Sequence, residues 1–303
     1  MIAGLLRLAL MLSALLLAGS ASAADEDRQT LVHDGLERSY VVRVPALPAP
    51  SGGWPLVLML HGGGGNAENA ETMTGFTPKA REAGFIVAYP EGSGRLRGKL
   101  LSWNAGHCCG YAMTQSVDDV GFINALIDRL SARYPVDARR IYATGMSNGG
   151  MMTHRLGIEL AARLAAIAPV VATVFGDENK PASAVSALMI NGALDLNVPQ
   201  LGGAPGGPGA RAWDGTPMRP ALEQAAFWAK ADACAETPVT IEQPAATQWR
   251  YRCAGGKAVE LYLVRDNGHA WPGGQPGSRR GDVPTQALNA TDLIWAFFQA
   301  HPR

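Results

Sequence analysis

The feature of this sequence that most restricts its fold is the pentapeptide Gly145-Met146-Ser147-Asn148-Gly149, together with its surroundings. Residues 140–144 are predicted to form a short buried strand, and residues 150–156 to begin a helix. Between a strand and a helix, this pattern is typical of a nucleophile elbow, a tight turn that leaves the serine hydroxyl exposed above a sheet. The pentapeptide alone would be a weak signal, because small residues often gather in turns. Its context makes Ser147 the candidate nucleophile.

The rest of the chain alternates strand-like and helix-like segments, which predicts an α/β fold with a mostly parallel central sheet and helices on both faces. Continuous apolar runs at 55–60 and 85–90 are typical of central strands that are covered on both sides. Residues 39–44 predict an early antiparallel strand, 259–264 the last strand, and 291–300 a final amphipathic helix. With 303 residues, 47% of them hydrophobic, the chain can bury a large core.

Residues 1–24 have the composition of a secretory signal peptide. Arg7 precedes an apolar run from Leu8 to Ala18, and the small residues Ala21-Ser22-Ala23 follow it. The apolar run is short for a membrane-spanning helix, which disfavours an uncleaved anchor. We therefore expect cleavage after Ala23 or Ala24, a secreted or periplasmic protein, and no membrane association after cleavage.

The charges and cysteines restrict the partners. Lys and Arg together number 26, as do Asp and Glu, so the chain has no basic footprint for nucleic acid. Cys234 and Cys253 stand 19 positions apart, and in an oxidising compartment a disulfide there would contribute roughly 3 kcal/mol. The adjacent Cys108 and Cys109 are, by elimination, a vicinal disulfide or a pair of thiols. Their spacing does not match a zinc site, so we expect no metal.

A serine hydroxyl is a poor nucleophile unless a base removes its proton and a third group orients that base. After an elbow serine, the acid and then the histidine are expected on loops at the carboxyl ends of later strands. Asp195 directly follows a predicted strand at 187–190, and His269 directly follows the strand at 259–264. The sequence therefore predicts Ser147, Asp195 and His269 as a catalytic triad.

Other aspartates and histidines fit these positions less well. Asp177 also follows a predicted strand, but one strand earlier along the chain than the usual position of the acid. Asp214 lies in a Gly/Pro-rich segment, 201–220, that we interpret as a surface insertion. His107 is the rival base, but it precedes the serine and stands beside the cysteine pair. We therefore exclude all three from the predicted triad.

The negative charge that develops on a substrate carbonyl oxygen needs hydrogen-bond donors that are already in place. One expected donor is the backbone N–H of Asn148, the residue after the candidate nucleophile. The second is expected from the loop His61-Gly62-Gly63-Gly64-Gly65-Asn66, where glycines let the backbone come close to an ester. We favour Gly63, with Gly64 as the alternative. A phosphate-binding loop is disfavoured because no Lys-Ser/Thr pair follows.

Two further pairs of residues stand near these loops. Trp103 and Trp271 are candidates for stacking on an aromatic or apolar acyl group, although packing of the loops is an equally open interpretation. Asp118-Asp119 could be interpreted as a metal-binding pair, but we expect these residues to cap the helix that follows them.

Five motifs occur along the chain: His61–Asn66, Trp103–Gly106 with Cys108-Cys109-Gly110, Val117–Phe122, Gly145–Gly150 and Gly268–Gly273. Together they resemble the exported esterases of the polyhydroxybutyrate depolymerase and feruloyl esterase group, from about residue 31 to the C-terminus. The resemblance implies an α/β-hydrolase fold, with residues 25–303 as a single catalytic domain. It also implies hydrolysis of carboxylic esters without a metal or organic cofactor, and it is consistent with disulfides at both cysteine pairs.

Many polyester depolymerases of this group carry a linker and a separate polymer-binding domain, whereas this sequence ends just after its last predicted helix. We therefore expect soluble or plant-wall esters, such as hydroxycinnamates on arabinoxylan, to be as suitable as polyester oligomers. The same triad would serve an acetyl xylan esterase, a peptidase or an acyltransferase. A non-catalytic binding protein is disfavoured, because such proteins usually lose a triad member. We expect a monomer.

Overall fold

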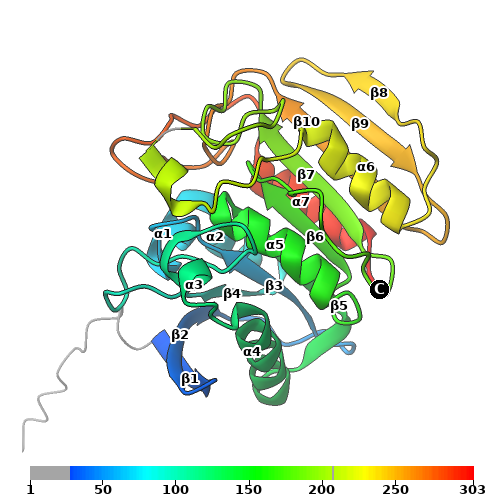
Figure 1. Ribbon diagram of the computed structural model, residues 1–303. Coiled ribbons are helices and arrows are strands. Elements are labelled where there is room, and N and C mark those ends of the chain that lie inside the picture. The colour runs from blue at the N-terminus through cyan, green and yellow to red at the C-terminus, as the bar shows by residue number, and fades with distance from the viewer. Residues whose placement is uncertain (1–27, 207) are drawn as a thin grey trace, which may run out of the picture.

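The computed structural model describes residues 28–206 and 208–303 (Figure 1), and the predicted signal peptide, residues 1–24, lies outside them. The strands of the described residues are β1 (Arg28–His33), β2 (Leu36–Arg43), β3 (Trp54–Leu60), β4 (Ile86–Pro90), β5 (Val136–Met146), β6 (Ala166–Val170), β7 (Ser186–Gly192), β8 (Val239–Glu242), β9 (Ala246–Arg252) and β10 (Ala258–Val264). The helices are α1 (Ala67–Thr74), α2 (Phe76–Ala83), α3 (Gly110–Thr114), α4 (Asp119–Arg133), α5 (Asn148–Glu159), α6 (Ala221–Ala231), α7 (Ala290–Ala300) and the short 3₁₀ helix η1 (Pro208–Ala212).

All the strands belong to one sheet, in the order β1-β2-β4-β3-β5-β6-β7-β10-β9-β8. The central strands, from β4 to β10 in this order, pair in parallel. Antiparallel pairs complete both ends of the sheet, β1-β2-β4 at one end and β10-β9-β8 at the other. This arrangement confirms the prediction of a mostly parallel central sheet.

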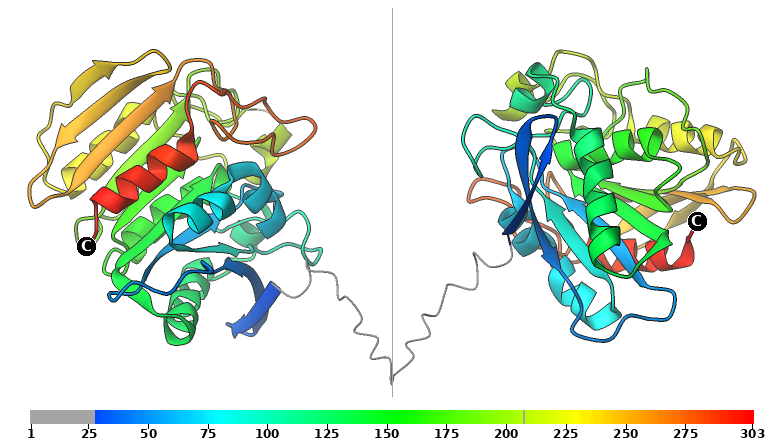
Figure 2. Two further views of the ribbon diagram at one scale, coloured as in Figure 1. Left: turned by 180° about the vertical axis from the view of Figure 1, so that it is seen from behind. Right: turned by 90° about the horizontal axis from the view of Figure 1, so that it is seen from below.

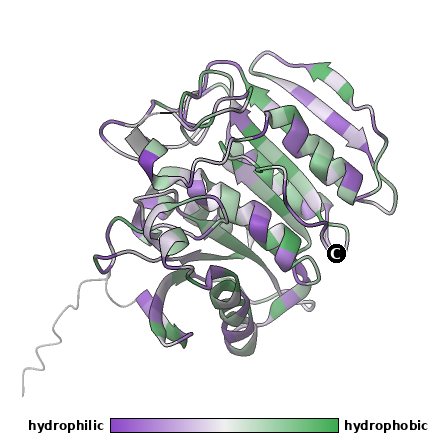
Figure 3. Cartoon of the chain, in the orientation of Figure 1, coloured by the Kyte–Doolittle hydropathy of each residue, from purple (hydrophilic) through white to green (hydrophobic). Residues whose placement is uncertain are grey.

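Helices cover the two faces of the sheet, as Figures 1 and 2 show. Along the fully buried strand β3, Leu56 and Leu58 pack on the face covered by α4, α5 and α6, whereas Val57 and Met59 pack on the face covered by α1, α2 and α7. Because neighbouring side chains of a strand point to opposite faces, a strand buried on both faces needs a continuous apolar run. Figure 3 shows this apolar colouring along the central strands.

The two aspartates at the start of α4 have different roles. Asp118 caps the helix, since its carboxylate accepts the N–H of Gly121 at 2.9 Å, as predicted. Asp119 is fully buried instead, where it pairs with Arg38 at 2.6 Å and accepts the backbone N–H of Asn104 at 2.7 Å. The expectation that both residues cap the helix is therefore wrong for Asp119, which anchors the loop that precedes the cysteine pair.

Two segments connect the sheet to its surroundings. Cys234, just after α6, forms a disulfide with Cys253, just after β9, so the bond ties a covering helix to the antiparallel end of the sheet. The Gly/Pro-rich insertion contains η1, which packs against α3, and therefore folds back over the molecule. Within the described residues, no helix has both the length and the hydrophobicity needed to cross a lipid bilayer.

Two histidines are buried in the fold and stay neutral. His61 accepts a hydrogen bond from the Gly92 N–H at 3.0 Å, and His154 accepts one from the Trp228 indole at 2.9 Å. Burial lowers the pKa of His61 to about 4 and that of His154 to about 3. In the unfolded chain both should titrate near the ordinary value of about 6.5. Protonation below that pH therefore favours the unfolded state.

We predict that the free energy of unfolding falls as the pH is lowered below about 6.5. Each buried histidine should remove about 1.5 kcal/mol between pH 6.5 and pH 5, because the slope rises from half to nearly all of about 1.4 kcal/mol per pH unit as the unfolded chain takes up the proton. Urea unfolding at several pH values measures this for the wild type and for His154→Gln, which keeps an acceptor for Trp228. The variant should lose about 1.5 kcal/mol less over this range, and parallel pH profiles would contradict the prediction.

Candidate active site

The turn between β5 and α5 presents Ser147 at the carboxyl edge of the sheet. Ser147 has φ 56° and ψ −123°, a left-handed conformation that side-chain-bearing residues rarely adopt. Its N–H donates to the Val170 carbonyl at 2.9 Å, and its own carbonyl accepts the Met151 N–H at 2.8 Å. A Cβ on Gly149 would overlap the main-chain oxygens of Leu60 and His61, so only glycine lets the helix approach β3 this closely.

The structure brings the three predicted triad residues together. Ser147, Asp195 and His269 follow β5, β7 and β10, whose carboxyl ends lie at one edge of the sheet because these strands are parallel. The His269 Nε2 atom lies 2.8 Å from the Ser147 Oγ atom. On the other side of the ring, His269 Nδ1 lies 2.8 Å from Asp195 Oδ2. The side chains therefore form a continuous chain of hydrogen bonds from the acid to the hydroxyl.

The surroundings of Asp195 determine which nitrogen of His269 carries the proton. The Asp195 side chain is buried, and its Oδ1 accepts the backbone N–H groups of Asn197 and Val198, each at 2.8 Å. These donors stabilise an ionised carboxylate, whose other oxygen can only accept from His269 Nδ1–H. Nε2 is then left without a proton and faces Ser147, which is the arrangement a general base needs.

The two candidate oxyanion donors, the N–H groups of Asn148 and Gly63, belong to residues that line the same cavity as Ser147. Asn148 is the first residue of α5, so its N–H has no partner within the helix. The Gly64 N–H donates to the Leu101 carbonyl at 2.7 Å. Among the hydrogen bonds of residues 28–206 and 208–303, none uses the N–H of Gly63, and a Cβ there would stand 3.5 Å from the Asn148 Cβ. This geometry favours Gly63 over Gly64 as the second donor.

Buried hydrogen bonds hold the glycine loop, the elbow and Trp103 together. The Asn148 side-chain amide accepts the Trp103 N–H at 2.7 Å and donates to the Trp103 carbonyl at 2.9 Å. The Trp103 indole donates to the His61 carbonyl at 2.9 Å, at the start of the glycine loop. Trp103 is fully buried. Its predicted contact with substrate is therefore wrong, since its ring packs the loops that carry the donors.

Trp271 is also fully buried, so its predicted contact with substrate needs the same correction. Its indole donates to Thr291 Oγ1 at 3.0 Å, and its ring meets the edge of Phe76 with the centroids 6.0 Å apart. Both tryptophans therefore have the packing role that the sequence left open as the alternative to substrate contact. Their large apolar rings find more contact between helices and sheet than they would at an open site.

Two cavities meet at Ser147. The larger has a volume of about 470 Å³ and is lined by Leu101, Tyr111, Asn148 and Trp213 among others. The smaller, of about 170 Å³, is lined by Met73, Met146 and Asp282 among others. Ser147, His269 and Gly63 line both of them. An ester whose carbonyl carbon reached Ser147 would therefore have one compartment for each of its halves.

Three residues of this site carried no signal in the sequence. Tyr111 lies on α3 and Trp213 in the Gly/Pro-rich insertion, and both line the larger cavity. The Asp282 carboxylate accepts the backbone N–H of His269 at 2.6 Å and so holds the loop of the candidate base. None of these residues belongs to one of the five motifs. Each reaches the site only through the folding of a long loop.

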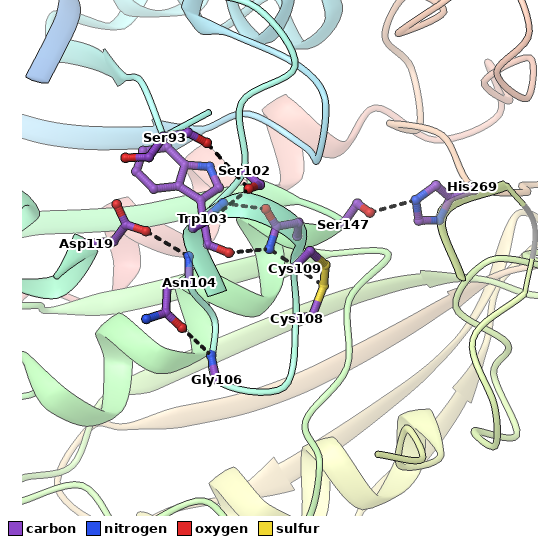
Figure 4. The surroundings of a disulfide bond; sticks show 12 residues. Ser93, Ser102, Trp103, Asn104, Gly106, Cys108, Cys109, Asp119, Ser147 and His269 are labelled. Atoms are coloured by element: carbon purple, nitrogen blue, oxygen red, sulfur yellow. Dashed lines mark hydrogen bonds between the residues drawn. A yellow bond between two sulfur atoms is a disulfide. The ribbon is translucent and has the colours of Figure 1, made fainter. Parts of the chain in front are cut away.

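The adjacent cysteines form a vicinal disulfide beside the candidate nucleophile, as Figure 4 shows. Cys109 lines the larger cavity, and the Asn148 amide nitrogen lies 3.7 Å from the Cys108 sulfur. Between the two interpretations that the sequence left open, the structure has the disulfide. The disulfide therefore stands beside Asn148, the candidate oxyanion donor.

The three residues excluded from the triad lie together elsewhere. His107 Nδ1 is 2.7 Å from Asp214 Oδ2, and His107 Nε2 is 2.8 Å from Asp177 Oδ2. Because both ring nitrogens face carboxylates, His107 has no nitrogen available to deprotonate Ser147. In the part of the chain that the structure describes, no group of three or more His, Cys, Asp or Glu side chains is arranged to hold a metal ion.

Comparison with known sequences finds a family profile and relatives that are described as esterases. The profile of the family described as Esterase PHB depolymerase matches residues 38–201. "Putative esterase NocK" of Nocardia uniformis subsp. tsuyamanensis is 31% identical over 268 residues, which cover 84% of this chain and 76% of that protein. "Feruloyl esterase B" of Piromyces equi is 30% identical over 247 residues, which cover 79% of this chain and 44% of that protein. The alignment therefore spans less than half of the second relative.

Comparison with solved structures identifies the fold. The acetyl xylan esterase from Aspergillus awamori superimposes with a TM-score of 0.63 at 14% sequence identity, over 90% of this chain and 99% of that chain. At this level of identity the similarity is one of fold alone. It confirms the predicted α/β-hydrolase fold.

We predict that Asn148→Ala lowers kcat by about 10- to 100-fold with little change in KM for a p-nitrophenyl ester. The substitution keeps the Asn148 N–H but leaves the buried Trp103 N–H without a partner. It also removes one of two donors to the Trp103 carbonyl, which still accepts the Cys109 N–H at 3.0 Å, so we expect the loop that contains Trp103 to shift. Steady-state kinetics test this, with Asn124→Ala, a loss of the same amide on α4, as the matched control. Equal activity in the two variants would contradict the prediction.

Proposed function

Because the chain belongs to the Esterase PHB depolymerase family and is a carboxylic ester hydrolase, we propose that Ser147, His269 and Asp195 perform its chemistry through an acyl-enzyme. The observation that carries the proposal is the hydrogen-bonded chain from Asp195 through His269 to Ser147, with 2.8 Å at each contact. The same geometry serves as nucleophile, base and orienting acid on several unrelated folds.

The first half of the reaction acylates the serine. His269 Nε2 takes the proton of Ser147 as the hydroxyl oxygen attacks the ester carbonyl carbon. Asp195 holds the ring in the correct tautomer and stabilises the imidazolium that forms. The N–H groups of Asn148 and Gly63 stabilise the negative charge on the carbonyl oxygen, and such donors are worth most in a site that excludes water. His269 then gives its proton to the leaving alcohol.

The second half releases the acid. Water enters the place of the alcohol, His269 takes one of its protons, and the hydroxide oxygen attacks the acyl-enzyme carbonyl. The same two N–H groups stabilise this second oxyanion, and the proton returns from His269 to Ser147 as the acyl bond breaks. The net reaction is ester plus water to acid plus alcohol.

We propose that the acyl group occupies the larger cavity and that it carries an aromatic ring, as in feruloyl esters. Both proposed oxyanion donors, Gly63 and Asn148, line that cavity, whereas only Gly63 lines the smaller one. The side chains of Tyr111 and Trp213 at its wall suit stacking on a planar ring. The similarity to a relative named feruloyl esterase B supports this choice.

A second candidate substrate is a 3-hydroxybutyrate oligomer. Leu194 and Leu196 flank Asp195 and are 61% and 78% exposed, and Val283, beside Asp282, is 79% exposed. Large apolar side chains exposed at the rim of a site are typical of contact with an apolar partner. A polyester chain would lie across such a rim, whereas a single hydroxycinnamate would not need it.

We also propose that the protein is exported, as a monomer with residues 25–303 as one catalytic domain. The signal-peptide pattern of residues 1–24 supports export. Two disulfides, Cys108–Cys109 and Cys234–Cys253, support an oxidising compartment, since disulfides persist mainly outside the cytoplasm.

The proposed function predicts that Ser147→Ala abolishes acid release from every ester that the wild type hydrolyses. We would measure the release of acid from methyl ferulate, a 3-hydroxybutyrate trimer and acetylated xylan, with Ser131→Ala, an exposed serine on α4, as the matched control. Preference for ferulate supports the first substrate, and preference for the trimer supports the second. Hydrolysis that survives Ser147→Ala would refute the mechanism.

We predict that Asp195→Asn lowers kcat by about 10³- to 10⁴-fold while KM changes little. An amide at this position no longer fixes the tautomer of His269 or stabilises its imidazolium, although it fills the same space. Stopped-flow or steady-state kinetics on p-nitrophenyl butyrate measure the loss. Asp128→Asn, an exposed aspartate on α4, is the control, and a loss smaller than tenfold in Asp195→Asn would exclude Asp195 as the acid.

A further inference from the structure

We propose that Trp213 selects the acyl group of the substrate and that His107 positions Trp213 from outside the larger cavity. The inference rests on the proposed function, because it concerns the acyl half of an ester attacked by Ser147. It assigns a role to the Gly/Pro-rich insertion and to the three residues that the triad excludes.

Trp213 forms part of the wall of the larger cavity. It follows directly on η1, is half-buried, and lines the same cavity as Ser147 and Tyr111. Its ring meets the edge of Phe175 with the centroids 5.9 Å apart and an interplanar angle of 63°. A half-buried indole supported from behind by another ring can offer its remaining surface to an apolar group of the substrate.

The backbone of Trp213 is attached to the segment that contains the vicinal disulfide. Trp213 forms an isolated antiparallel bridge with Cys108, and the Asp214 N–H donates to the His107 carbonyl at 3.2 Å. These bonds join the insertion to the segment of the vicinal disulfide, whose Cys109 also lines the cavity. A change at His107 therefore reaches Trp213 through adjacent residues.

His107 holds the insertion by ion pairs to two loops. Its Nδ1 lies 2.7 Å from Asp214 and 3.0 Å from the Thr216 hydroxyl, both in the insertion. Its Nε2 lies 2.8 Å from Asp177, in the segment between β6 and β7. The imidazole also contacts the Phe175 ring, with the centroids 5.0 Å apart. Two carboxylates can both accept from the ring only when both nitrogens carry protons.

The charges around His107 set the pH range in which its ion pairs hold the insertion. Partial burial lowers the pKa of His107, but hydrogen bonds and charge from Asp214 and Asp177 outweigh it, so the pKa lies above its ordinary value. The other titratable or charged side chains at the cavity of about 280 Å³ beside His107 are His154, Arg155, Glu159 and Glu178. His154 is neutral, Arg155 pairs with Glu159 at 2.6 Å, and Glu178 accepts two backbone N–H groups.

The direction of the pH effect follows from the protonation of His107. Below its raised pKa the imidazolium donates to both carboxylates, and the insertion is held in place. As the pH rises through that pKa the ring keeps one proton, one carboxylate faces a lone pair, and the hold on Trp213 weakens. Selectivity for a bulky acyl group should therefore fall at alkaline pH.

The test of Trp213 compares two selectivities that share one reference ester, methyl propionate. Acyl selectivity is the ratio of kcat/KM for methyl cinnamate to that for methyl propionate. Alcohol selectivity is the ratio of kcat/KM for benzyl propionate to that for methyl propionate. Trp213→Ala should lower acyl selectivity about tenfold, as expected for the loss of one aromatic contact, and leave alcohol selectivity within about twofold. Trp213→Phe should restore most of the loss. Trp249→Ala, a half-buried tryptophan on β9, should change neither ratio.

The test of His107 uses the pH profile of acyl selectivity. Titration of the triad affects both esters alike and cancels in the ratio, so the profile isolates groups that act on the acyl group. The wild-type ratio should fall as the pH rises, and His107→Gln should be about threefold lower at neutral pH and independent of pH. His33→Gln, which removes a similar His–Asp pair at Asp118, is the matched control and should keep the wild-type profile.

Each outcome decides between the positioning role and its absence. Acyl selectivity that Trp213→Ala leaves unchanged, or that falls together with alcohol selectivity, overturns the role of Trp213. A pH-independent ratio in the wild type overturns the role of His107. Ser147→Ala, measured on the same esters, keeps the two proposals apart: if it abolishes hydrolysis while Trp213→Ala leaves selectivity unchanged, only the present inference fails.

Discussion

Ser147 is held in a left-handed backbone conformation between β5 and α5, and both its hydroxyl and the Asn148 N–H take their positions from that turn. The turn directs the hydroxyl away from the sheet and places the first free N–H of α5 at Asn148. It also requires glycine at 149, where the helix passes the end of β3 without room for a side chain. Strain of this kind persists only where the surrounding structure determines it strongly. Here the hydrogen bonds of Ser147 to Val170 and Met151 supply that restraint.

The elbow is joined to the glycine loop by polar groups that are almost entirely buried. Asn148 binds both backbone groups of Trp103, and Trp103 binds the carbonyl of His61. Each such bond adds about 0.5–1.5 kcal/mol, but breaking the only bond of a buried group leaves that group unpaired at a cost of about 1–3 kcal/mol. The network therefore fixes geometry more than it adds stability, and it explains why a tryptophan next to the site faces inward.

The sequence was sufficient to predict the parallel core of the sheet and which candidate residues meet at its carboxyl edge, because both depend on short-range patterns. Strand order brings the ends of parallel strands to one edge, so Asp195 and His269 could be predicted from their places after strands. The directions of Trp103 and Trp271 could not, since a side chain next to a loop can face either the core or the cavity. Tyr111 and Trp213 were missed for a related reason: long loops, whose path no local pattern specifies, bring them to the site.

The candidate active site joins parts of the chain that are far apart in sequence. Ser147 and His269 are separated by 122 residues, and Asp195 and His269 by 74. Contacts between residues this far apart in sequence form late in folding, after large loops have closed. During synthesis the strand β10 emerges well after β5 and β7, so an unfinished chain contains Ser147 before it contains His269. Under the proposed mechanism, the nascent protein is therefore inert toward esters until nearly the whole sheet has been made and assembled.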